Sequence, residues 1–302
     1  MRVLLLALLA AGAATAQPAP EGSPLWIAER LFDPAGFPQL DAYVDPSAVP
    51  VDSGGKPTSF AQLVTPGATV SFRALPSDSS QATITARLEE ADDGVDLYLH
   101  FVRDGEHWTF RRLRSLALPG YYYVFIDVLT LWDEVRELPS AETAFWSGVD
   151  EQFDLIASDI MIRDMSGREM VSSLFGEDPS SFDTLLVDLP AMQLSVASDS
   201  TLKAFFQTRR EAFEQVRSAY GTPPGHRTSS DSGDELAASL LGLSVLYASP
   251  DGDSLTVLVG GFLDSEVGYI YAGEGVEPPR SGEGNYIYVE ALGGGWYLYK
   301  TT

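Results

Sequence analysis

The chain has 302 residues, with 43 Asp and Glu against 19 Lys and Arg, a formal net charge of −24, and no Cys. This negative charge repels the phosphates of nucleic acids and of anionic membrane surfaces, so we expect neither as a partner. The lack of Cys excludes disulfides and thiolate metal sites. With only three His, a histidine-rich metal centre is not expected either, and no cofactor signature occurs.

The N-terminus reads as a secretory signal peptide over residues 1–16. Met1-Arg2 gives a positive start, Val3–Ala11 forms an apolar run, and Ala14-Thr15-Ala16 fits a cleavage site. We therefore expect an exported protein, periplasmic or extracellular, that begins with a Pro-rich tail over residues 17–24. The apolar run is far shorter than the roughly 20 residues of a spanning helix, so we expect no transmembrane helix.

Residues 25–118 predict short helices followed by an antiparallel sheet. Leu25–Phe32 and Pro38–Tyr43 have helical patterns that end at Asp-Pro steps, and residues 70–74 begin the strands. From Gln81 to Ala117 three apolar-alternating segments follow one another, with an Asp104-Gly105 hairpin turn between the last two. The shared apolar face is Ala82, Ile84, Ala86, Leu88, Val95, Leu97, Leu99 and Phe101.

The opposite face of this meander is polar and holds one group of candidate site residues. Tyr98 and His100 lie two positions apart on one strand, and Arg112 falls on the next. If this face lines a pocket, His100 is suited to general acid–base work while Tyr98 and Arg112 orient a substrate. The alternative is an ordinary solvated sheet face with cross-strand pairs.

Short helices followed by a sheet whose last hairpin reads HFVRDGEHWTFRRL resemble the nuclear-transport-factor-2-like (SnoaL-like) fold. The resemblance covers about a third of the chain, and the aromatic strand after Asp104-Gly105 is its main feature. It implies a cone-shaped sheet wrapped over helices, with a pocket inside. Families with this fold include isomerases, hydratases and many non-catalytic modules. The whole chain, through its closing GWYLYKTT, also resembles exported bacterial proteins of unknown role.

The middle of the chain, residues 119–221, predicts a helical region. One apolar stripe starts at Tyr121, a second follows Ser140, and the clearest stripe runs from Leu202 to Tyr220 after a cap at Asp199 or Ser200. Residues 158–198 allow either a strand or a buried loop, and we leave their structure open. Residues 222–234 have the composition of a linker.

Residues 235–302 predict a second antiparallel β-meander. Its expected strands are Ser244–Ala248, Ser254–Phe262, Val267–Ala272, Tyr286–Leu292 and Trp296–Thr301. On the last three strands Tyr alternates with mostly aliphatic residues, which predicts one tyrosine face suited to stacking on sugar rings or on a protein. Its members are Tyr269, Tyr271, Tyr286, Tyr288, Tyr297 and Tyr299. The alternative is that helices cover this face.

The sequence thus predicts an α+β protein, with an N-terminal cone-like antiparallel sheet and short helices, a helical middle and a C-terminal antiparallel β-meander. Since no catalytic motif occurs, we expect a non-catalytic binding or scaffold protein of the bacterial envelope. Its partner would be a small molecule, a glycan or an envelope protein, and a homodimer is left open. The alternative function is a small-molecule isomerase or hydratase that uses the N-terminal pocket.

Overall fold

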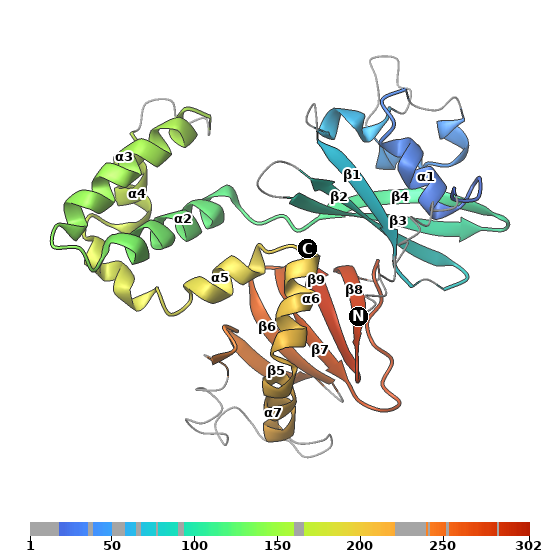
Figure 1. Cartoon of the computed structure of the whole chain (residues 1–302). Helices are drawn as coiled ribbons and strands as arrows, with labels where there is room; N and C mark the ends of the chain where they lie inside the picture. The colour runs from blue at the N-terminus through green and yellow to red at the C-terminus, as the bar shows by residue number, and fades with distance from the viewer. Residues whose placement is uncertain are drawn as a thin grey trace, which may run out of the picture.

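The fold was analysed in a computed structural model that describes residues 18–35, 39–49, 58–64, 68–76, 78–89, 94–159, 166–220, 240, 242–251, 254–282 and 284–302. It contains helices, a four-stranded and a five-stranded antiparallel sheet, which confirms the α+β class (Figure 1). The expected signal peptide and linker lie outside the described residues. No helix in the described ranges is long and apolar enough to cross a membrane.

The N-terminal sheet forms in the order that the sequence predicts. Its strands are β1 (Thr69–Ala74), β2 (Gln81–Glu89), β3 (Gly94–Asp104) and β4 (His107–Ser115), paired in chain order. They follow helix α1 (Pro24–Leu31) and the short 3-10 helices η1 (Leu40–Ala42), η2 (Pro46–Ala48) and η3 (Phe60–Leu63). A bulge between His100 and Phe101 places Phe101 opposite Phe110, while His100 stays opposite Arg112.

The apolar face of this sheet packs on α1, as its alternating pattern predicts. Ile84, Leu99 and Phe110 share a core with Ile27 and Leu31 of α1, and all five are almost fully buried. Burial of such side chains stabilises by about 1.5–3 kcal/mol each. Val95, at the start of β3, is the exception on this face, because it is 49% exposed.

The helical middle has its own core. It comprises α2 (Gly120–Val135), α3 (Ala141–Asp159), α4 (Gly167–Phe175), the 3-10 helix η4 (Pro179–Thr184) and α5 (Leu189–Ser195). Phe145 packs edge-on against Trp132 of α2 and Phe182 of η4. In Figure 1, α2, α3 and α4 form an arm to one side of the sheets. The segment that we left open between strand and loop contains α4, η4 and α5, joined by short turns, and no strand where it is described.

The helical stripe after residue 198 is two helices, α6 (Asp199–Thr208) and α7 (Arg210–Tyr220). The predicted single helix is wrong, because Arg209 leaves the helical conformation and its backbone N–H closes the end of α6. The cap is Ser198 rather than Asp199 or Ser200, since the Ser198 hydroxyl accepts a hydrogen bond from the Thr201 N–H at 3.2 Å.

Helices α6 and α7 pack on the C-terminal sheet, in a core that Leu194 of α5 also joins. Phe206 and Phe213 lie against Tyr269 and Trp296, with ring centroids 4.8–5.6 Å apart. These four rings are almost completely buried in one core with the strands. We expected a helical region to end at residue 221 and a separate β region to follow. Helices α6 and α7 nevertheless share a core with the strands of that β region.

The C-terminal sheet comprises β5 (Tyr247–Asp251), β6 (Ser254–Phe262), β7 (Ser265–Ala272), β8 (Tyr286–Gly293) and β9 (Trp296–Thr301). Its order is β5-β6-β7-β9-β8, so the predicted simple meander is wrong for the last strands. The short Gly-rich turn after β8 makes β8 and β9 a hairpin. The much longer connection from β7 to β8 leaves room for β9 beside β7. Strand β5 also begins three residues later than predicted.

Candidate functional site

Most of the polar face of the N-terminal sheet is buried, because Thr83, Thr85, Tyr98 and His100 are each less than 10% exposed. It packs against the start of α6 and the C-terminal sheet. The Tyr98 ring is fully buried 5.1 Å from the Tyr288 ring, and Leu75 and Tyr98 belong to the core of the C-terminal half. We call the contact between the N-terminal sheet, β1–β4, and the C-terminal half, α6 to β9, the junction. The residues that the sequence singled out on this face therefore lie in the junction.

His100 is sealed inside this junction. It is 4% exposed, its Nδ1 lies 3.2 Å from the Thr83 hydroxyl, and its Nε2 has no hydrogen-bond partner in the described part of the molecule. Burial, with the nearby charges of Arg112 and Arg114, lowers the pKa of His100 to about 3. The imidazole is therefore neutral near pH 7 and is poorly placed for general acid–base catalysis.

The predicted trio does not converge on one point. The Tyr98 hydroxyl donates to Asp199 Oδ1 at 2.8 Å, whereas the Arg112 guanidinium donates to the Gly282 carbonyl at 2.6 Å. Each side chain thus has a partner in the C-terminal half of the chain. Tyr98 thus lies at a separate contact from Arg112, while His100 stays opposite Arg112 on the neighbouring strand.

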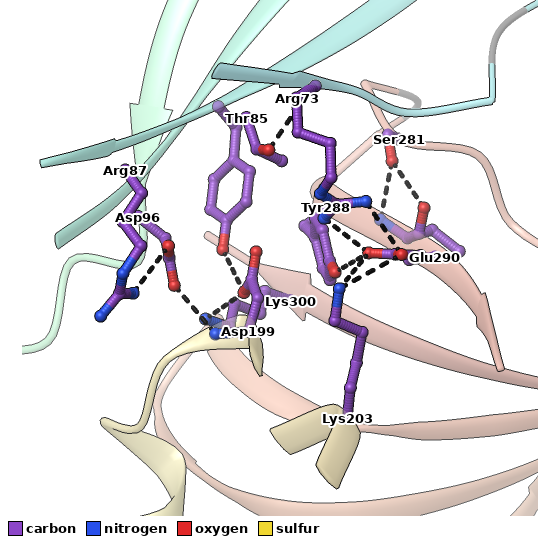
Figure 2. A network of polar contacts seen from close by, with 12 residues as sticks. Arg73, Thr85, Arg87, Asp96, Asp199, Lys203, Ser281, Tyr288, Glu290 and Lys300 are labelled. Atoms are coloured by element: carbon purple, nitrogen blue, oxygen red, sulfur yellow. Dashed lines mark hydrogen bonds and ion pairs between the residues drawn. The ribbon is translucent and has the colours of Figure 1, made fainter. Parts of the chain in front are cut away.

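A buried ion pair lies at the centre of the junction. Lys300 Nζ on β9 is 2.8 Å from Asp199 Oδ1 at the start of α6, and the two side chains are only 3% and 7% exposed (Figure 2). The Asp199 backbone N–H donates to Asp96 Oδ2 at 2.9 Å, and the other Asp96 oxygen binds Arg87 at 3.1 Å. Burial raises the pKa of Asp199, with Asp96 adding to the rise, although Lys300 opposes it.

A second ionic cluster lies beside the first and is centred on Glu290 of β8. Arg73 of β1 binds both oxygens of Glu290, at 2.9 and 2.8 Å, and Lys203 of α6 lies 3.3 Å away (Figure 2). The Tyr288 hydroxyl also donates to Glu290. These hydrogen bonds lower the pKa of Glu290 against the effect of burial. Arg73 and Glu290 thus tie the edge strand of one sheet to the edge strand of the other.

A cleft of about 640 Å³ adjoins the ion pair, where β3, α2, α5 and α6 meet. Its walls carry cations and carboxylates in equal number, together with hydroxyl and amide groups. The polar and aromatic residues that line it are Arg87, Asp96, Tyr123, Asp127, Gln193, Ser198, Thr201 and Lys300. Arg87 and Lys300 are already paired with acids, which leaves Asp127 as the carboxylate without a partner among the described residues.

The six tyrosines predicted to share a face are divided between the two faces of the C-terminal sheet. Directly opposite residues share a face, and Tyr271 lies opposite Trp296 while Tyr297 lies opposite Ile270. A bulge between Tyr286 and Tyr288 also changes the phase of β8. A shift of one residue moves every side chain of a strand to the other face. The prediction of a single tyrosine face is wrong because it assumed the wrong register between these strands. The side of Trp296 has Tyr269, Tyr271 and Tyr288, and the other side has Tyr286, Tyr297 and Tyr299.

These tyrosines therefore do not form one exposed ladder. Tyr269 and Tyr288 are fully buried and Tyr299 is 2% exposed. The Tyr269 hydroxyl donates to the Leu202 carbonyl of α6 at 2.9 Å, which shows that helices cover this side of the sheet. The sequence offered no sign of the cleft or of the Asp199–Lys300 pair, because its residues come from segments far apart in the chain.

The comparisons with known proteins give no relative: no protein-family model, no curated protein and no solved structure matches the chain.

Proposed function

We propose that the protein is an exported, non-catalytic binding module of the bacterial envelope whose ligand site is the cleft beside Lys300. Export is supported by the leader pattern over residues 1–16. We also infer a nuclear-transport-factor-2-like relationship for residues 25–118. It is supported by the helices that precede the antiparallel strands and by the apolar face that packs on α1.

The observation on which the ligand site rests is the cleft itself. A volume of about 640 Å³ has the size of a small-molecule site, and such sites combine few directed polar groups with apolar walls. Ile126, Val196 and Leu116 supply the apolar part. Asp127 supplies a carboxylate whose pKa is raised by burial and which has no protein partner in the described ranges. A small polar molecule with a hydroxyl or amino group near Asp127 fits these walls.

The proposal is a binding function because the best acid–base candidate is inaccessible. His100 is buried and neutral, and its ring lies close to the Thr83 hydroxyl and to Gly282. No feature of the junction favours the isomerase or hydratase alternative over binding. A group that must exchange protons with a substrate has to reach it within hydrogen-bond distance.

The experiment compares two tryptophan variants of the mature protein. Thr201→Trp places a large ring in the cleft, whereas Glu211→Trp adds the same ring at an exposed position on α7. Native mass spectrometry of the protein from its own host and a thermal-shift panel of sugars, amino acids and polyamines identify binders. We expect Thr201→Trp to lose binding at least tenfold and Glu211→Trp to keep it. Equal binding by both variants would remove the cleft as the ligand site.

A further inference from the structure

The buried contact between Lys300 and Asp199 has the geometry of a reactant pair. The amine nitrogen lies 2.8 Å from a carboxyl oxygen, and both groups are held in place by separate elements, β9 and α6. Held groups at contact distance react far faster than free ones, because the entropy of bringing them together has already been lost. We propose that Lys300 and Asp199 form an intramolecular isopeptide bond.

The reaction is a condensation that needs no cofactor, oxidant or reductant. The neutral Lys300 amine attacks Asp199 Cγ, the carbon–oxygen bond to one carboxyl oxygen breaks, and that oxygen leaves as water. Starting from the ammonium and the carboxylate, the nitrogen gives up two protons, both of which leave with the oxygen. The product is an amide, and the protein becomes lighter by one water molecule.

The surroundings favour the neutral reactants that this step requires. An ion pair inside a protein loses the solvation of both charges, so transfer of a proton from amine to carboxylate is less costly there than in water. Burial raises the pKa of Asp199, as expected for such a site. The Tyr98 ring centroid lies 5.9 Å from Lys300 Nζ, and the Tyr288 ring lies 5.1 Å from the Tyr98 ring.

Two neighbouring groups are placed to assist. The Tyr98 hydroxyl donates to Asp199 Oδ1 at 2.8 Å and would stabilise negative charge that develops on that oxygen during attack. Asp96 is a second carboxylate close by, fixed by the Asp199 N–H and by Arg87, and its negative charge favours the neutral form of Asp199. Lys300 and Asp96 both line the cleft, which gives the released water a path out.

The bond would act as a covalent staple in a chain that has no Cys for a disulfide. It would fix the last strand to the first turn of α6, beside the contacts between the two halves of the molecule. This inference does not depend on the proposed ligand, because it concerns only groups of the chain itself.

Intact-mass measurement tests the proposal on the mature, folded protein after its N-terminus has been determined. We expect a mass one water below the sequence mass, and a branched proteolytic peptide that joins the segments of Asp199 and Lys300 in tandem mass spectrometry. Lys300→Arg keeps the positive charge and should show the full sequence mass. Lys203→Arg alters the lysine paired with Glu290 and should retain the water loss.

Two results would overturn the proposal. One is a wild-type protein with the full sequence mass after prolonged incubation in the folded state. The other is a water loss that persists in Lys300→Arg or that maps to an Asp-Gly step such as Asp104-Gly105, where a cyclic imide forms. Since the wild-type peptide map decides the matter alone, the test holds even if the Lys300 variant fails to fold.

Discussion

Phe213→Ala tests the assignment of α6 and α7 to the core of the C-terminal sheet. The Phe213 ring is fully buried, 4.8 Å from Tyr269, 5.0 Å from Phe206 and 5.5 Å from Trp296. Truncation of a buried Phe to Ala costs about 3–5 kcal/mol, and loss of the aromatic contacts places this site in the upper part of that range. We therefore expect the free energy of unfolding to fall by about 4–5 kcal/mol.

The matched control is Phe205→Ala on the neighbouring helix. Phe205 is only partly buried, and its ring lies 6.3 Å from Phe213 with the Arg209 guanidinium 4.4 Å away. Partial burial and a cation–π contact at the surface predict a loss of about 1–2 kcal/mol. Urea unfolding followed by tryptophan fluorescence measures both. If Phe213→Ala costs no more than Phe205→Ala, helix α7 does not pack on the sheet as described.

Three further predictions concern the junction and the sheet packing. Tyr98→Phe removes a hydroxyl that donates to Asp199 and, with Asp199 in the proposed amide, should cost about 1 kcal/mol in chemical denaturation, as should Tyr122→Phe, whose partner is the Ser195 hydroxyl. A cost of about 1.5–3 kcal/mol for Tyr98→Phe, the range for a hydrogen bond to a charged group, would mean that Asp199 is an ionised carboxylate and that no amide has formed. Because the pKa of His100 is lowered to about 3 in the folded protein, folding should become less favourable as pH falls from about 6.5 towards 3, where the unfolded chain binds the extra proton. NMR should show the imidazole neutral at pH 5, and a charged ring there would contradict its burial. Gly268→Ala should destabilise by about 1–3 kcal/mol, since a Cβ would lie 2.5 Å from the Val257 carbonyl, whereas Gly120→Ala meets no atom and should leave the melting temperature unchanged or higher.

Many elements of this protein could be predicted from local patterns, but α4, η4 and α5 were not, because residues 158–198 show no clear period. The alternation along β2 and β3 gave their apolar face, and Ile84, Leu99 and Phe101 are buried as expected. The stripe that begins at Tyr121 became α2. These predictions succeed because side-chain direction repeats every two residues in a strand and every three to four in a helix.

The sequence by itself thus determined the types of most elements outside residues 158–198, the α+β class and the absence of disulfides, since these depend on neighbouring residues and on composition. Only the tertiary structure decided which strand lies beside which, and hence that the six tyrosines divide between two faces. It also decided that Tyr98, Asp199 and Lys300 meet in one buried cluster. Contacts between distant segments depend on register, bulges and packing between elements, and no local periodicity contains that information.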